Sequence, residues 1–322
     1  MKAKIILLLK KNYPDFTSGE EISRLLGVSR TAVWKHIRKL KESGYQIEAH
    51  SKVGYRLNHS PDMLFEHELT AALNSNILGR RIVYREVVGS TNELAKELAQ
   101  KGTEEGTVVI AEEQTSGKGR MGRVWYSPAE KGLWFSLILR PPISPADASK
   151  LTLVCAVAVA QTIREVTGVS AGIKWPNDIL VKNMKLAGIL TEMNAEIDKV
   201  HYLIVGIGVN VNLVREEFPD ELSELATSLA CQTGQRVSRL EVLVALLSNL
   251  DRLYQDFVEG KFSQILSLWK QMSVTLNRRV KVQSFEEVHE GIAFDLDDEG
   301  ALLLMKEDGT LRRILSGDVS LR

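Results

Sequence analysis

Residues 114–128 read Gln114-Thr-Ser-Gly117-Lys118-Gly119-Arg120-Met-Gly122-Arg123-Val-Trp125-Tyr-Ser-Pro128, and this segment narrows the choice of fold more than any other. Its glycines match the dinucleotide-binding fingerprint Gly-x-Gly-x-x-Gly, but that fingerprint must open a helix, and the Val-Trp-Tyr-Ser-Pro that follows does not suit one. A P-loop would need Lys and Ser or Thr after Gly122. A flexible backbone with three cations remains, which is typical of a loop that closes over an anionic ligand. A surface turn with incidental charges is the alternative.

Two apolar segments further along the chain also carry polar residues. From Ile173 to Leu190 we expect a strand containing Lys174 and Asp178, a turn at 182–184, and a second strand entered at Lys185. Residues 203–212 read as an apolar strand broken by two glycines, where a ligand or another backbone must approach closely. Taken one at a time, these polar residues are explained equally well as hairpin charges, turn residues and strand ends.

The first 60 residues form a basic head. They hold 12 Lys and Arg against five Asp and Glu, although the whole chain of 322 residues is balanced at 41 of each, so the rest is acidic. We expect two short helices here, the first with an apolar face of Ile22, Leu25 and Leu26 and ended by Gly27, and the second capped by Ser29. Alternation around 52–55 predicts a β-hairpin wing after them. This pattern indicates a helix-turn-helix that binds DNA, with a merely solvated helical hairpin as the alternative.

The remaining features concern the cell compartment. Cys155 and Cys231 lie far apart and outside any Cys-x-x-Cys pair, so we expect neither a disulfide framework nor a thiolate metal site, and a reducing cytoplasm fits best. The apolar run of residues 5–9 is too short for a signal peptide, and residues 151–160 are too short to cross a bilayer. We expect no membrane segment.

Five motifs occur together in a fixed order and resemble those of biotin protein ligases. They are Val88-Gly-Ser90-Thr91-Asn92, Gln114 with the glycine-rich segment to Trp125, Lys174-Trp-Pro-Asn-Asp178, Lys185-Leu-Ala-Gly188-Ile-Leu190, and Gly206-Ile-Gly-Val-Asn210. With the basic head, the chain is similar to the bifunctional bacterial type, which also represses genes of biotin synthesis and transport. One departure is Lys118, where relatives often have Arg; the charge is kept but the bidentate geometry is lost.

This resemblance implies roles for individual residues. Arg120, Lys185 and Asp178 are expected to be catalytic, with Asp178 beside the incoming lysine. The biotin-binding positions are expected at Ser90, Thr91, Asn92, Gln114, Gly117, Lys118, Arg120, Trp125, Lys185, Gly188 and Leu190. The nucleotide-binding positions are expected at Arg120, Arg123, Trp125, Lys185, Asn210 and Arg322. The DNA-binding positions, which follow from the pattern of the head, are expected at Ser29, Arg30, Thr31, Trp34, Lys35, Arg38 and Lys52. No metal ligand among the side chains is expected.

The resemblance further implies an α+β multidomain protein. Residues 1–62 would form a winged helix-turn-helix, 63–272 a class II synthetase-like α/β catalytic domain with helices near 90–101, 146–167 and 238–259, and 273–322 an SH3-like β-barrel with strands near 279–283, 291–296 and 301–306. The activity implied uses biotin, ATP and Mg²⁺ to form biotinyl-5′-AMP and then biotinylates one lysine of biotin carboxyl carrier protein. Operator DNA and a homodimer promoted by biotinyl-5′-AMP are the further partners implied. A lipoate-type ligase and a ligand-sensing transcription factor without catalysis are the alternatives.

Overall fold

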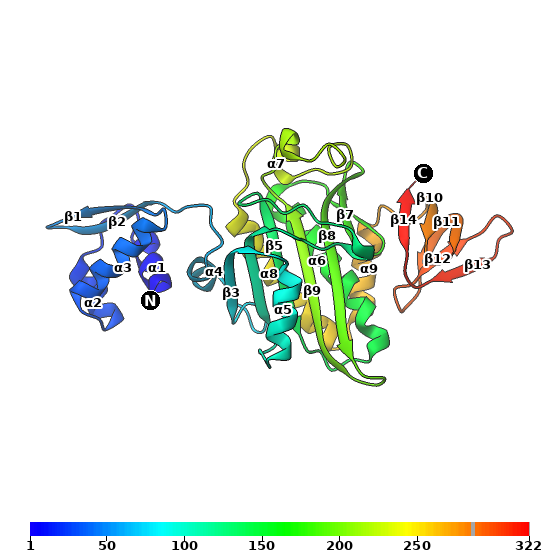
Figure 1. Ribbon diagram of the computed structural model, residues 1–322, viewed down its shortest axis with the longest axis horizontal. Helices are drawn as coiled ribbons and strands as arrows, with labels where there is room; N and C mark the ends of the chain where they lie inside the picture. The colour runs from blue at the N-terminus through cyan, green and yellow to red at the C-terminus, as the bar shows by residue number, and fades with distance from the viewer. Residues whose placement is uncertain (285–286, 322) are drawn as a thin grey trace. The chain divides into compact units, whose positions relative to one another are not determined.

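The computed structural model describes residues 1–284 and 287–321 (Figure 1). The chain divides into two compact units, Met1–Leu73 and Asn74–Arg322. The first unit is the head and the second is the body.

The head is a helical unit with a β-hairpin. Its elements are α1 (Lys2–Lys11), α2 (Gly19–Leu26), α3 (Arg30–Glu42), β1 (Gln46–His50), β2 (Gly54–His59) and α4 (Glu66–Ala72). The Ser18 hydroxyl caps α2, Gly27 ends it in a left-handed conformation at φ 64°, and the Ser29 hydroxyl caps α3. These local signals produce the predicted helix-turn-helix, and the hairpin β1–β2 confirms the predicted wing.

The predicted apolar face of α2 is wrong at one position. Ile22 is buried in the core of the head and Leu26 packs against that core, but the Leu25 side chain is 54% exposed. Leu25 directly precedes Leu26, so a 100° turn of the helix carries it away from the narrow contact with α3. The core is completed by residues of α1, α3 and the hairpin, including Ile6, Val33 and Leu57.

Helix α4 is attached to the rest of the head by a buried polar network. The Glu68 side chain, 1% exposed, accepts hydrogen bonds from Lys10 Nζ at 2.7 Å and from the Tyr45 hydroxyl at 2.6 Å. The Tyr45 hydroxyl also contacts His67 Nε2 at 2.8 Å, and the His67 ring stacks on Phe65. The compact head runs to Leu73, past residue 62 where the resemblance implied that the domain ends, and includes α4.

A seven-stranded sheet forms the centre of the body, in the order β3-β4-β5-β9-β8-β7-β6. Its strands are β3 (Ile82–Val88), β4 (Thr107–Gln114), β5 (Gly132–Leu139), β6 (Gly172–Lys174), β7 (Asp178–Val181), β8 (Met184–Ala195) and β9 (Val200–Asn210). The helices of the body are α5 (Thr91–Gln100), α6 (Ala148–Thr167), α7 (Leu229–Thr233), α8 (Arg239–Val258) and α9 (Phe262–Met272), with short 3₁₀ turns at Arg120–Gly122, Pro145–Asp147 and Arg215–Glu217.

Helices cover both faces of this sheet (Figure 1). Glu192 of β8 bonds to Lys96 of α5, whereas the neighbouring Thr191 bonds to Thr152 of α6. Because successive side chains of a strand point to opposite faces, α5 and α6 lie on opposite sides of the sheet. Helices α8 and α9 pack against α6.

Two predicted strands differ in detail from those observed. The strand expected through Lys174 and Asp178 is interrupted at residues 175–177, where Pro176 has no N–H to donate to a ladder, so that β6 and β7 are separate strands. The glycines at 206 and 208 do not break β9, which runs through both. They instead leave room for side chains from outside the sheet, because a Cβ at Gly206 would meet Asn92 Oδ1 at 2.2 Å.

The last part of the body is a five-stranded antiparallel sheet in the order β13-β12-β11-β10-β14. Its strands are β10 (Arg279–Gln283), β11 (Val288–Leu296), β12 (Leu302–Met305), β13 (Leu311–Ile314) and β14 (Asp318–Leu321). It is attached to the rest of the body near the break between β6 and β7, where the buried Trp175 indole donates to the Gly300 carbonyl at 3.1 Å. The backbone N–H of Trp175 donates to the Thr275 hydroxyl.

Two buried polar contacts help to hold the body together. Arg239 at the start of α8 and Glu112 of β4 form an ion pair of 2.7 Å with both side chains buried. Asp251 of α8 accepts the backbone N–H groups of residues 76, 77 and 78, which fixes the beginning of the body. Both cysteines are free, Cys155 buried in α6 and Cys231 exposed on α7.

Among the described residues one helical segment, Pro145–Thr167, is long and apolar enough to cross a bilayer. In the body, 67% of its apolar window is buried. Helix α6, which makes up most of the segment, contacts α8, α9 and the sheet, so it has the surroundings of a core helix.

The network around α4 predicts acid sensitivity of the head. Burial, with Lys2 as a second cause, lowers the pKa of His67 to about 4 from an ordinary value of about 6.5. Since the unfolded chain then binds a proton that the folded head excludes, the free energy of unfolding should fall as the pH drops from 6.5 towards 4. His67→Gln should reduce this slope in thermal unfolding at pH 7, 6 and 5. The control is His59→Gln, which removes an exposed imidazole of β2; equal slopes for His67→Gln and the parent would contradict the prediction.

Candidate functional site

The body contains a cavity of about 360 Å³ above the middle of the central sheet. Its floor is formed by β5, β8 and β9, one wall by the glycine-rich loop after β4, and another by residues 218–226. The start of α5 and Asp318 of β14 complete the lining. The cavity is therefore assembled from segments that are distant in sequence, and it is large enough for a small organic ligand.

Trp125 lies against the floor of the cavity over two paired glycines. Gly188 of β8 and Gly208 of β9 are directly opposite each other in the ladder. A Cβ at Gly208 would meet Trp125 Nε1 at 2.4 Å, and a Cβ at Gly188 would meet Trp125 Cζ3 at 3.0 Å. The absence of two side chains thus provides the space in which the indole lies, and Trp134 borders it edge-on.

One end of the cavity is lined by neutral hydrogen-bonding groups. The side-chain carbonyl of Gln114 accepts the backbone N–H and the hydroxyl of Thr91 at 2.8 and 3.0 Å. The Gln114 amide donates to Ser127 at 2.9 Å, and the Ser136 hydroxyl contacts Thr91 at 2.8 Å. Ser90 lines the cavity beside them. Such a set can recognise a polar, uncharged group at the end of an apolar ligand.

The other end of the cavity is cationic and contains a buried carboxylate. Asp178 Oδ1 is 2.7 Å from Lys185 Nζ, and Asp178 Oδ2 is 3.2 Å from Lys174 Nζ. Burial alone would raise the pKa of Asp178, but the two ammonium groups hold it below its usual range. The Lys185 ammonium also lies 5.2 Å from the centre of the Trp125 ring. Asp178 therefore stays ionised at neutral pH and fixes Lys185 at the cavity wall.

The two arginines of the glycine-rich loop point towards the C-terminal sheet. Arg120 donates to Asn177 Oδ1 at 2.9 Å and to the Gly317 carbonyl at 3.3 Å, and Arg123 is paired with Asp318. Within the loop, residues 117–119 pair with 123–125, so the loop is a tight hairpin with Arg120–Gly122 at its tip. The dinucleotide-binding fingerprint and the P-loop both lead into an α-helix, whereas no α-helix follows the glycines of this hairpin.

Most residues predicted for the site from the sequence lie together around this cavity. The lining includes Ser90, Thr91, Asn92, Gln114, Lys118, Arg120, Arg123, Trp125, Asp178, Lys185, Gly188, Leu190 and Asn210. Gly117 is behind the lining, where a Cβ would meet the Trp125 carbonyl at 2.4 Å, and Arg322 lies outside the described residues. The cavity is also lined by Asn177, the wall at residues 218–226 and Asp318, which were not predicted from the sequence. Asn177 lay inside a quoted motif, whereas the other two have no local signal.

The DNA-binding positions predicted on the head are exposed. Ser29, Arg30, Thr31, Trp34, Lys35 and Arg38 lie at the start and on the outer face of α3, and Lys52 lies in the turn of the hairpin. The Trp34 side chain is 49% exposed, with the Arg38 guanidinium 5.1 Å from its ring centre. Trp34 is therefore accessible on the outer face of α3.

No group of three or more His, Cys, Asp and Glu residues that could hold a metal ion occurs in the described part of the chain. The carboxylates in the lining are Asp178, which is paired with two lysines, and Asp318, which is paired with Arg123. Each of these two carboxylates already has a cationic partner, so a magnesium ion here would be carried largely by the phosphates of a nucleotide.

Comparisons with known proteins agree with this arrangement. Residues 84–210 match the Biotin/lipoate A/B protein ligase family, residues 2–56 an HTH domain, and residues 275–322 the Biotin protein ligase C terminal domain. The chain is 42% identical to the bifunctional ligase/repressor BirA of Bacillus subtilis, covering 100% of this chain and 98% of that protein. It is 30% identical to BirA of Escherichia coli, over 99% and 96%.

Among solved structures, biotin protein ligase from Aquifex aeolicus in complex with biotin and ATP is similar with a TM-score of 0.65 and 32% identity. The match covers 76% of this chain and 99% of that one.

The glycine pair beneath Trp125 leads to a stability prediction. Gly208→Ala should cost only about 1–2 kcal/mol, because the displaced indole can swing into the open cavity. Gly132→Ala is the contrasting variant, since its Cβ would meet the fully buried Trp134 ring at 2.3 Å and should cost roughly 3 kcal/mol or more. Chemical denaturation of both variants checks the order; equal losses, or a larger loss for Gly208→Ala, would show that Trp125 is as fixed as a core residue.

Proposed function

The chain belongs to the family of bifunctional biotin ligases and repressors, and from that membership we propose a function for each part of the cavity and of the head. The enzyme is a biotin ligase with a DNA-binding domain. The observation that carries the detailed proposal is a single cavity with a neutral polar end, an indole over paired glycines, and a cationic end.

Biotin has a neutral ureido ring, an apolar bicycle and a carboxylate. We place its ureido ring at the neutral end, against Ser90, Thr91 and Gln114, where donors and acceptors are already held in position. The apolar part then lies along the floor near Gly188 and Leu190, and the carboxylate points to the cationic end. Asn92, Lys118 and the backbone at Gly117 border this position.

The first reaction joins the biotin carboxylate to the α-phosphorus of ATP, forming biotinyl-5′-AMP and releasing pyrophosphate. Two anions must approach each other, so fixed positive charge lowers the barrier. Lys185, held by Asp178, and Arg120 supply that charge in our proposal, and Mg²⁺ bound to the phosphates supplies more. We assign the adenine side to Trp125 and Asn210; the Asn210 amide donates to the Thr227 carbonyl at 3.0 Å. Arg123, which is paired with Asp318 in the structure, would leave Asp318 and bind the nucleotide instead.

The second reaction transfers biotin to one lysine of biotin carboxyl carrier protein: the amine attacks the mixed anhydride, an amide forms, and AMP and a proton leave. The lowered pKa of Asp178 makes it a weak base. We therefore propose that Asp178 orients the incoming amine and Lys185, and that it is not the principal proton acceptor.

The head is proposed to repress genes of biotin synthesis and transport in the cytoplasm. Its α3 has the exposed cationic face that major-groove recognition requires, and a single small head can neutralise only a few phosphates. We therefore propose that two copies bind a two-fold symmetric operator as a homodimer promoted by biotinyl-5′-AMP.

Replacing Lys185 tests the ligase proposal. Lys185→Ala should slow pyrophosphate release with biotin and ATP by roughly 100-fold, while biotin affinity changes much less, since charge at the phosphate matters most in the transition state. The matched control is Lys182→Ala, which removes a lysine from the turn between β7 and β8. Unchanged pyrophosphate release in Lys185→Ala would contradict the assignment. Preference for lipoate over biotin in a competition assay would favour the lipoate-type alternative.

The repressor proposal is tested by removing the head and by titrating the operator. A chain lacking residues 1–73, the whole compact head, should keep ligase activity and lose DNA binding. In the full chain, Lys35→Ala should weaken operator binding by roughly three- to tenfold without changing pyrophosphate release. Operator affinity at fixed salt should rise when biotin and ATP are added. Equal affinity with and without them would show that DNA binding is not coupled to the ligand.

A further inference from the structure

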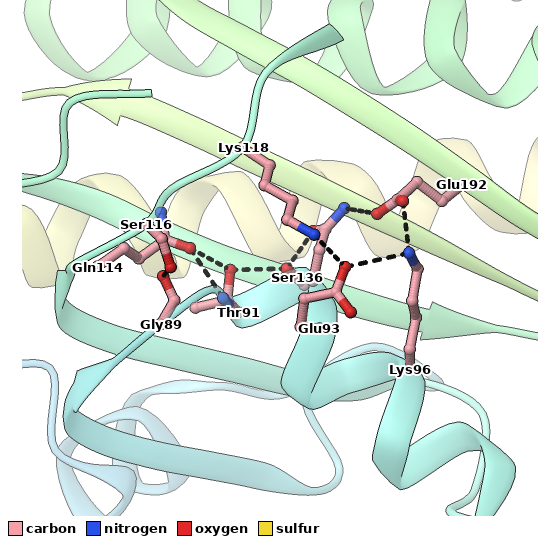
Figure 2. A network of polar contacts seen from close by, with 10 residues as sticks. Gly89, Thr91, Glu93, Lys96, Gln114, Ser116, Lys118, Ser136 and Glu192 are labelled. Atoms are coloured by element: carbon pink, nitrogen blue, oxygen red, sulfur yellow. Dashed lines mark hydrogen bonds and ion pairs between the residues drawn. The ribbon is translucent and has the colours of Figure 1, made fainter. Parts of the chain in front are cut away.

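The start of α5 reaches the glycine-rich loop from outside the cavity through a chain of charged side chains (Figure 2). Lys118 of the loop donates to Glu93 Oε1 at 2.6 Å. Lys96, one turn further along α5, lies 3.2 Å from the same oxygen and 2.6 Å from Glu192 of β8. Positive and negative charges therefore alternate from the loop, across the helix, to the sheet.

The same turn of α5 is held by hydrogen bonds of buried side chains. The amide of Asn92 donates to Glu192 at 2.7 Å, and its carbonyl accepts the Ser136 hydroxyl at 2.6 Å. Thr91, Asn92 and Ser136 are all at most 5% exposed. Glu93 follows directly on these residues, so its backbone has a fixed position relative to the sheet, and its carboxylate is a fixed point for Lys118.

Lys118 lies in the first arm of the loop hairpin, so a displacement of Lys118 would also move the arm that pairs with it. It is bridged to Val124 on the opposite arm, and the neighbouring Gly117 carbonyl accepts the Trp125 N–H at 2.9 Å. Just before it, Ser116 is attached to Gly89 by its backbone N–H at 2.9 Å and its hydroxyl at 3.0 Å. This arm is thus fixed twice, once to the Gly89 backbone and once to Glu93. Arg120 at the tip and Trp125 on the opposite arm both line the cavity.

Glu93 remains charged over the physiological range. Hydrogen bonds from Lys118 and Lys96 outweigh burial and hold the pKa of Glu93 below its usual value. Lys118 is thereby paired with a carboxylate that does not itself line the cavity.

We infer that Glu93 is a positioning residue for the ligase reaction: through Lys118 it holds the loop hairpin over the cavity and so prolongs the lifetime of bound biotinyl-5′-AMP. This inference rests on the proposed function. It assigns to Lys118 a side-chain role towards Glu93, in addition to any backbone contact with biotin. Lys96 bridges Glu93 to Glu192 of β8 and so connects this contact to the sheet.

The test measures how fast the full-length chain releases biotinyl-5′-AMP that it has made from biotin and Mg²⁺-ATP. Glu93→Gln should accelerate release roughly three- to fivefold, the value of one partly exposed ion pair. Its apparent KM for biotin should rise by a similar factor, while the single-turnover rate of adenylation at saturating biotin changes less than about twofold. Glu97→Gln is the matched control, because Glu97 is an exposed residue of the same helix one turn further on.

A double-mutant cycle separates this role from a general structural one. If Glu93 acts through Lys118, Lys118→Gln should accelerate release as much as Glu93→Gln, and the double variant should be no faster than either. Additive effects in the cycle, parental release in Glu93→Gln, or a lowered melting temperature with parental release would each overturn the inference. A parent chain that forms no biotinyl-5′-AMP would instead overturn the proposed function, and the inference with it.

Discussion

A carboxylate in a protein interior must be matched by cations, and the cationic end of the cavity depends on this constraint. Asp178 is buried at the start of β7 and stays ionised because Lys174 and Lys185 lie beside it. The requirement fixes Lys185 over the Trp125 ring, and Trp125 in turn lies on Gly188 and Gly208. One electrostatic condition therefore links the β7–β8 turn, the glycine-rich loop and the floor of the cavity.

The parts of the fold that sequence could predict are those with local signals. Gly27 and Ser29 mark helix ends in the head, and the order of five short motifs indicates the family and the residues that gather around the cavity. What was missed depends on contacts between distant residues. Asp318 and Arg123 form an ion pair although they are 195 residues apart in the sequence, and nothing in the sequence near either residue indicates this. Similarly, Leu25 fits a helical apolar pattern, but the contact with α3 is too narrow to cover it.

The start of α5 combines two roles that are often separate in proteins. Its buried residues join the helix to the sheet, because Asn92 occupies the space left by Gly206 and bonds to Ser136 and Glu192. Its partly exposed Glu93 accepts a hydrogen bond from Lys118 and so attaches the loop to the same helix. A loop rich in glycine loses much conformational entropy when it is ordered. Attachments of the first arm of the hairpin to Gly89 and Glu93 reduce that loss before any ligand arrives, and so favour binding.

The two cysteines differ in exposure, so the protein has a single accessible thiol for a spectroscopic probe. Burial in α6 raises the pKa of Cys155 to about 12, so its thiol is protected from alkylating reagents at neutral pH. Cys231 is exposed on α7, just after the segment that forms one wall of the cavity. A maleimide dye should therefore attach at one position without any engineered substitution. Its fluorescence would then report, in real time and in the natural sequence, on movements of that wall.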